Sequence, residues 1–167
     1  MNKPTSAAAF RKAAAALREA AISLRAFVLI QPPFVAPADA AALARRTFEL
    51  AREEGARVVS LLPVFSTHRP LRLLAARDFF AAPSLETVFD TAASCAGRGV
   101  TVLVETEHLD RLEACGNCGK RRRAALVALN RTGDLTPVSC IDHRAASDPA
   151  VRGFDRTEVL EALRAPA

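Results

Sequence analysis

Tryptophan and tyrosine are absent from this 167-residue sequence, and phenylalanine is the only large aromatic residue available to a core. Leucine, valine and above all alanine must therefore supply most apolar contacts. Small side chains bury little apolar surface each, and small domains are hard to stabilise by burial alone. We therefore expect a bound metal or a partner to add stability. The length corresponds to one domain with a small appendage.

Long apolar runs are absent as well. No stretch reaches the roughly 18 consecutive apolar residues that a transmembrane helix needs, so no membrane contact is expected. The N-terminal region contains Lys and Arg but no continuous apolar segment, which argues against a secretory signal. We expect a cytoplasmic protein, because thiols stay reduced there and can bind metal.

Common catalytic motifs are also missing. The chain has no serine–histidine–aspartate motif, no Walker loop and no G-x-G-x-x-G pattern, which excludes the simplest interpretations as an acyl- or phosphoryl-transfer enzyme. Glu105 and Glu107 end a predicted strand, where parallel-sheet proteins bind ligands. An active enzyme that uses them with the 31–34 loop ranks last among our interpretations.

His68 and His108 are single histidines for which we predict capping or surface roles.

The composition that remains is that of a folded globular protein. Half of the residues are hydrophobic and 25% are charged. The formal net charge of +5 comes mainly from arginine. A basic surface attracts phosphate, but solvated arginine faces are common. The charge is therefore compatible with an RNA partner but does not by itself indicate one.

Hydrophobic patterning predicts alternating helices and strands. Three apolar runs indicate buried strands, at 26–30, 57–62 and 100–105. Helices are predicted around them, at 6–24, 37–55, from Pro70, from Ser84, at 106–114, at 120–130 and from Asp155. Strands separated by helices imply a parallel sheet with crossover connections. A complete (β/α)₈ barrel needs eight strands, so the chain can form only part of one, or a small open sheet. We expect an α/β fold that is a partial, half-barrel-like set of β-α units.

The predicted domain organisation has three parts. Residues 1–25 form an N-terminal amphipathic helix, 26–107 the β-α-β partial barrel, and 108–167 a zinc-binding helical tail. The tail contains a long polar stretch and little apolar sequence of its own. We therefore expect a metal to fasten it to the α/β part.

Cysteine spacing gives the strongest signal in the chain. Cys115-x-x-Cys118 is followed, after 21 residues, by Cys140-x-x-His143, and two such pairs can offer four ligands to one tetrahedral zinc ion. Four protein ligands leave no open position, so we predict a structural zinc site. A redox dithiol at Cys115 and Cys118, or an iron–sulfur cluster with one His ligand, are the alternatives. We predict that Cys95 is a small buried hydrophobe.

Four basic residues follow the second cysteine directly: Lys120, Arg121, Arg122 and Arg123. A cationic first turn opposes the helix dipole, at a cost of a few tenths to about 1 kcal/mol unless an anion compensates. We predict a contact with RNA or another anion here. The alternative is a solvated helix face.

Several short motifs resemble a known family. Ile30-Gln31-Pro32-Pro33-Phe34, the later Val58-Val59-Ser60-Leu61-Leu62-Pro63, and the Cys115-x-x-Cys118 turn before a basic helix are similar to the C-terminal half of archaeosine-synthase-type and Elp3-like radical SAM proteins. The likeness covers about residues 26–143. Cys115 and Cys118 match a family feature, whereas His143 rests on spacing.

The chain departs from that family at its catalytic motif. The Cys-x-x-x-Cys-x-x-Cys triplet that holds the family's [4Fe-4S] cluster is absent, so this chain alone is expected to hold no Fe-S cluster and not to act as an enzyme by itself. The resemblance implies a zinc-binding, non-catalytic accessory domain of radical SAM ancestry, linked to tRNA or other RNA modification. A radical SAM partner chain or homo-oligomer would complete the barrel and cover its sheet edges. The alternative is a small basic RNA-binding zinc protein.

Overall fold

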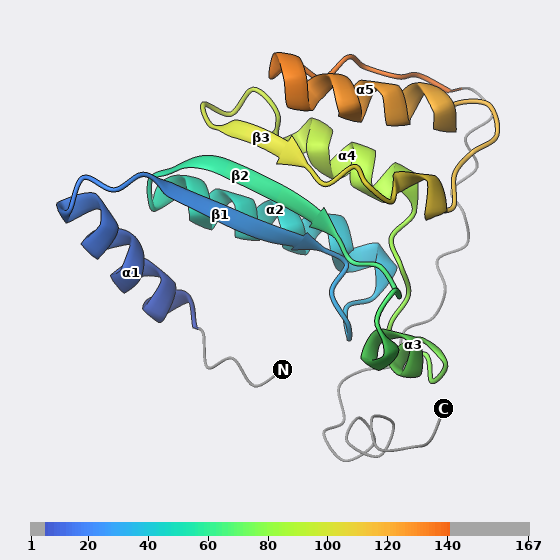
Figure 1. Ribbon diagram of the computed structural model, residues 1–167, viewed down its shortest axis with the longest axis horizontal. Coiled ribbons are helices and arrows are strands. Elements are labelled where there is room, and N and C mark those ends of the chain that lie inside the picture. The colour runs from blue at the N-terminus through green and yellow to red at the C-terminus, as the bar shows by residue number, and fades with distance from the viewer. Residues whose placement is uncertain (1–5, 141–167) are drawn as a thin grey trace.

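The computed structural model describes residues 6–140 and has an α/β fold (Figure 1). The elements in chain order are α1 (Ala7–Glu19), β1 (Leu24–Ile30), α2 (Pro37–Glu53), β2 (Ala56–Pro63), α3 (Arg69–Ala75), α4 (Leu85–Cys95), β3 (Thr101–Val104), the 3-10 helix η1 (Leu109–Arg111) and α5 (Gly119–Thr132). All three predicted strands are present, which confirms the α/β class. No helix in this described stretch is long and apolar enough to cross a membrane.

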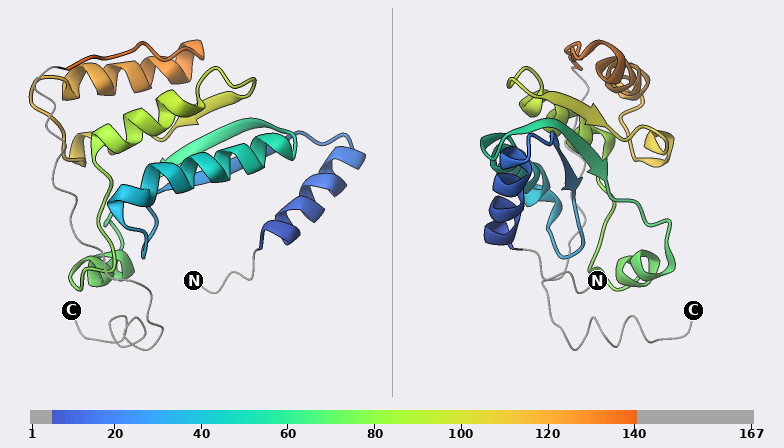
Figure 2. Two further views of the ribbon diagram at one scale, coloured as in Figure 1. Left: turned by 180° about the vertical axis from the view of Figure 1, so that it is seen from behind. Right: turned by 60° about the vertical axis from the view of Figure 1, so that its left-hand side comes forward.

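The strands form a parallel sheet in the order β1-β2-β3. Val28 of β1 pairs in register with Leu61 of β2, and Leu61 pairs with Val104 of β3. These three side chains are buried in the main core cluster. The left view in Figure 2 shows that α2 and α4 cover one face of the sheet. The arrangement is compatible with consecutive β-α units of a barrel. The half-barrel itself stays a prediction.

Local signals in the sequence set most helix ends. The hydroxyl of Ser6 accepts from the N–H of Ala9, and that of Ser84 accepts from the N–H of Thr87, so each caps its helix as an N-cap residue should. Gly55 adopts a φ of +90° just after α2, a conformation that glycine tolerates without steric cost. The first helix ends at Glu19, five residues earlier than predicted, because Leu24 already pairs with Ala56 in the sheet.

The predicted helix at 106–114 is wrong. Only the short 3-10 helix η1 forms there. The carboxylate of Glu105 accepts from the N–H of Glu107, and the carbonyl of Glu113 accepts from the N–H of Leu85 in the first turn of α4. Local side-chain bonding and attachment to α4 thus replace the helical hydrogen bonds that the pattern suggested.

Helix α5 shares the core of the sheet. Its side chains Leu126 and Leu129 lie in the same buried cluster as Val59 and Leu61. At the outer edge of β3, Asn130 takes the place of a neighbouring strand: its Oδ1 accepts from the N–H of Val104 at 2.8 Å, and its Nδ2 donates to the carbonyl of Val104 at 2.8 Å. The amide therefore satisfies main-chain groups that an edge strand leaves open.

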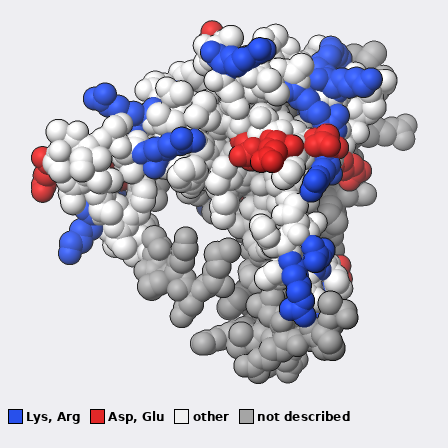
Figure 3. Space-filling view, in the orientation of Figure 1, with Lys and Arg blue, Asp and Glu red and all other residues white. Residues whose placement is uncertain are grey.

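The opposite face of the sheet is open and partly apolar. Phe27 is 61% exposed and Leu29 is 48% exposed, both on the side of β1 that faces away from α2. The guanidinium of Arg25 lies 5.1 Å from the Phe27 ring centroid and donates to the hydroxyl of Ser60 on β2. This face is turned toward the viewer in Figure 1. Figure 3 shows broad uncharged surface with scattered Lys and Arg, a group of acidic side chains right of centre and further acidic side chains at the edges.

Candidate metal centre

Three cysteines from two parts of the chain, the turn before α5 and the segment after it, lie together beside the first turns of α4 and α5. Cys115 follows the extended segment after η1, and Cys118 immediately precedes α5. Cys140 lies at the end of the 133–140 segment, which runs back along α5 toward its N-terminus (Figure 1). The Cys115 turn and the segment after α5 therefore meet, as the spacing predicted for these three residues.

The sulfur atoms have the spacing that a shared metal ion requires. All three Sγ atoms lie within 4.8 Å of one another, and Sγ of Cys115 lies 3.8 Å from Sγ of Cys140. Zn–S bonds of about 2.3 Å at tetrahedral angles place two bound sulfurs about 3.8 Å apart. Within residues 6–140, this is the one group of three or more Cys, His, Asp or Glu side chains placed to hold a metal. The group could therefore bind a metal ion.

Main-chain hydrogen bonds hold the Cys115 turn in place. Its carbonyl accepts from the N–H of Gly119 at 2.9 Å, and its N–H donates to Oε1 of Glu86 on α4 at 3.0 Å. A Cβ atom at Gly119 would lie 3.0 Å from Cβ of Ala114, so close approach favours glycine there. A Cβ atom at Gly116 would meet open space. Of the two glycines near the turn, Gly119 is sterically restricted and Gly116 is not.

The thiols of the cluster have unequal acidities. The main-chain N–H groups of Cys118 and Asn117 point at Sγ of Cys115 and lower its pKa to about 7, because they stabilise the thiolate. Burial is the largest cause that raises the pKa of Cys118 to about 11, and the positive charge of Arg122 opposes that rise. Thiolates are the metal-binding form, and a bound cation favours deprotonation of all three.

The buried Cys95 lies apart from this group. Burial raises the pKa of its thiol, which keeps it protonated. Its position in the core agrees with the predicted role as a small hydrophobe.

The four basic residues after Cys118 divide between the surface and the interior. Lys120 and Arg121 are exposed, and Arg121 donates to the carbonyl of Ser139. Arg122 is buried, with its guanidinium 5.0 Å from the ring centroid of Phe89 on α4. Arg123 donates to the carbonyls of Leu109 and Leu112.

Sequence reasoning missed both inward arginines. The spacing of Arg122 from Ala125, Leu126 and Leu129 places it on the buried face of α5, which is the signal that could have revealed it.

The fourth predicted ligand, His143, lies outside the described residues, as does the helix predicted from Asp155. The other candidate residues stand apart from the cysteines. Glu105 and Glu107 are exposed, and the ring of His108 packs edge-on against Phe65. The amide of Gln31 is buried and donates to the carbonyl of Ala81.

Comparison with known proteins adds no relative: no family model, no curated protein and no solved structure matches this chain. The centre is therefore interpreted from its own geometry.

Proposed function

We propose that the chain is a zinc-stabilised α/β domain in which Cys115, Cys118, Cys140 and His143 bind one structural zinc ion. The sulfur cluster is the observation that carries this proposal, because its spacing fits tetrahedral Zn–S geometry. Soft thiolate ligands favour zinc over magnesium or calcium, and four protein ligands leave no position for a reacting water. The zinc supplies cross-linking and no chemistry.

The contacts around the cysteines explain what such a cross-link would hold. Cys115 is attached to α4 through Glu86, Cys118 begins α5, and Cys140 ends the 133–140 segment. A zinc ion shared by the three would fasten α5 and the returning segment to the first turn of α4. It would thus add a cross-link to a region that also packs on the core through Leu126 and Leu129.

Purified full-length protein is expected to contain about one zinc per chain. Cys115→Ser and Cys118→Ser should each abolish tight binding, because a lost thiolate leaves the ion incompletely coordinated. His143→Ala should weaken binding and expose the metal to solvent. Elemental analysis and the visible spectrum of the cobalt-substituted protein measure these changes. Cys95→Ser is the matched control and should keep full zinc content; zinc loss in this variant but not in Cys118→Ser would contradict the ligand assignment.

The role that we propose for the domain is accessory: it docks on a radical SAM partner chain that acts in RNA modification. The open face of the sheet supports docking, because Phe27 and Leu29 are exposed apolar side chains on one continuous strand. Exposed apolar patches on a folded domain are typical of protein interfaces. Catalysis is assigned to the partner in this proposal, because the sequence given lacks the Cys-x-x-x-Cys-x-x-Cys motif of the radical SAM family.

Phe27→Ser is expected to weaken docking by about 30-fold or more, the loss that follows when an aromatic residue at the centre of an interface is removed. The measurement is the affinity for a purified radical SAM chain that carries the Cys-x-x-x-Cys-x-x-Cys motif, with size-exclusion chromatography to detect self-association. Val127→Ser on α5 is the control, because Val127 is 43% exposed but lies on another surface. Equal affinity of wild type and Phe27→Ser, or a homo-oligomer without partner binding, would contradict the proposed docking.

RNA binding by the isolated domain is supported by fewer residues than the sequence suggested. Of the four basic residues proposed for it, only Lys120 and Arg121 present their side chains at the surface, while Arg122 is buried and Arg123 is bonded to main-chain carbonyls. Two surface cations provide a small electrostatic footprint for a nucleic acid. RNA contact at Lys120 and Arg121 stays a prediction.

A further inference from the structure

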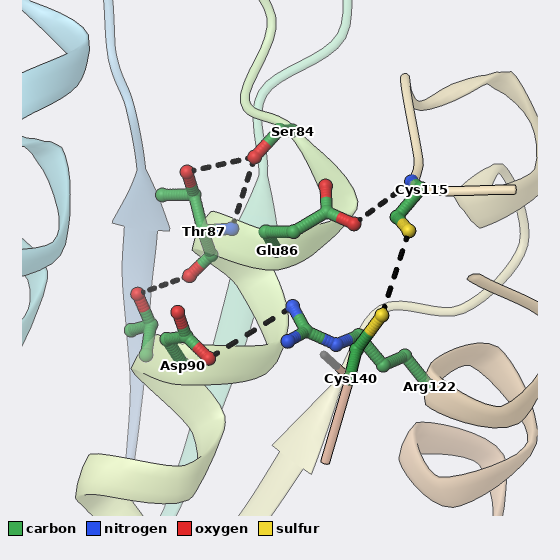
Figure 4. A network of polar contacts seen from close by, with 8 residues as sticks. Ser84, Glu86, Thr87, Asp90, Cys115, Arg122 and Cys140 are labelled. Carbon is green, nitrogen blue, oxygen red and sulfur yellow. Dashed lines mark hydrogen bonds and ion pairs between the residues drawn. The ribbon is translucent and has the colours of Figure 1, made fainter. Parts of the chain in front are cut away.

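A buried arginine, Arg122, lies beside the sulfur cluster. Arg122 lies on α5 one turn after Cys118, and its main-chain N–H donates to the carbonyl of that cysteine at 2.9 Å. Its side chain is only about 7% exposed and extends toward α4, where Figure 4 shows it between α5 and Asp90. A charged side chain is rarely buried without a compensating charge.

The visible partners of Arg122 do not compensate its burial. Nη1 lies 4.0 Å from Oδ1 of Asp90, a carboxylate that is 65% exposed, and such solvated pairs contribute little. The Phe89 ring offers a cation–π contact at 5.0 Å. Among the described residues, Nε and Nη1 of Arg122 have no hydrogen-bond acceptor, although both atoms are buried. Among the described residues, the guanidinium therefore has only the distant, solvated carboxylate of Asp90 as a compensating charge.

The proposed metal centre would supply that charge. A zinc ion with two positive charges, three thiolates and a neutral His leaves one negative charge on the complex. A buried group with net charge is costly unless an opposite charge lies close by. The main-chain bond from Arg122 to the carbonyl of Cys118 places the start of this side chain one turn from a proposed ligand. One buried arginine and one negatively charged complex would neutralise each other.

We propose that Arg122 is a positioning residue of the metal centre: its buried cation offsets the negative charge of the zinc–thiolate complex and raises the affinity for the metal. The inference rests on the proposed zinc site. It also assigns Arg122, the third residue of the basic run, to the protein's own metal centre and not to an external anion.

Arg122→Met removes the charge but keeps a long, flexible side chain that can pack on Phe89. Outer-shell partners of metal ligands typically contribute 10- to 100-fold in affinity, so zinc binding is expected to weaken by about that factor. Arg122→Lys retains the charge and should retain most of the affinity. Arg131→Met, an exposed arginine on the same helix, removes the same charge far from the cysteines and should leave affinity unchanged.

Affinities are measured on the full chain at constant pH and ionic strength, by competition with a chromophoric chelator. The second measurement is the urea midpoint of the metal-free protein, which should not fall in Arg122→Met, because an uncompensated buried cation has been removed. If Arg122 served only the stability of the fold, Arg122→Met would lower this urea midpoint and leave the zinc affinity of the folded protein unchanged.

The outcomes separate the two proposals. Wild-type protein that binds no zinc refutes the metal centre itself. Zinc binding by wild type, with equal affinity in Arg122→Met, overturns the role of Arg122 and leaves the ligand set intact. If Arg122→Met does not fold, a large loss of affinity in the folded Arg122→Lys variant would likewise contradict a role for the charge.

Discussion

Chelation of the metal is expected to release zinc and to lower the helical content of the protein, beginning with residues 109–140. The cysteines join α5 and the 133–140 segment to α4, so this region should lose hydrogen-exchange protection first. Strand β2 should stay protected longer, because Val59 and Leu61 lie in a core that α2 and α4 also cover. Circular dichroism and hydrogen-exchange mass spectrometry measure the two effects.

The expected size of this effect is large. Structural zinc contributes apparent free energies of about 10–16 kcal/mol in zinc-finger peptides, whereas entire domains are stable by only about 5–15 kcal/mol. Even a modest part of the zinc contribution would shift the unfolding midpoint strongly. Cys118→Ser should reproduce the metal-free behaviour, and Cys95→Ser should not. A metal-free wild-type protein with full helicity and unchanged exchange would contradict the structural role of the metal.

Asn130→Leu is expected to destabilise the protein by about 2–3 kcal/mol. The substitution removes both hydrogen bonds to Val104 and leaves a main-chain N–H and C=O without partners. Each unsatisfied group costs about 1–3 kcal/mol when buried, and the partial burial of this pair favours the lower part of that range. Urea denaturation gives the change in the free energy of unfolding.

Arg131→Leu is the matched control for Asn130→Leu, because it places the same apolar side chain at the next, exposed position of α5. It should change stability by no more than about 0.5 kcal/mol, as is usual at the surface. Equal stability of the two variants would show that water can replace Asn130 at the edge of β3.

Local chemistry made much of the fold predictable. The apolar runs gave the strands because a strand covered by helices is apolar along its length, and Ser84, Pro37 and Gly55 set helix ends through side-chain capping, a fixed φ and a positive φ. The Cys115-x-x-Cys118 pair predicted its own turn, and the second pair predicted the approach of Cys140.

The features that could not be predicted from the sequence depend on contacts between residues that are distant along the chain. The 106–114 segment has helical spacing at Leu109 and Leu112, yet attachment of Glu113 to α4 prevents a continuous helix. Asn130 resembles an ordinary helix residue until the edge of β3 is placed beside it. Arg122 belongs to a run of charged residues that predicts an exposed helix face. Only its position against Phe89 shows that its side chain is buried.

The order of the cysteines along the chain has a mechanical consequence. Cys115 and Cys140 stand 25 residues apart, and α5 lies entirely between them. A metal that joins both would make α5 part of a closed ring. Tension applied to the polypeptide beyond these ligands, as by an unfoldase that grips it there, would load a bond to the metal before it reached the hydrogen bonds of α5. The helix would therefore resist being unravelled from that side until the ion itself was pulled out.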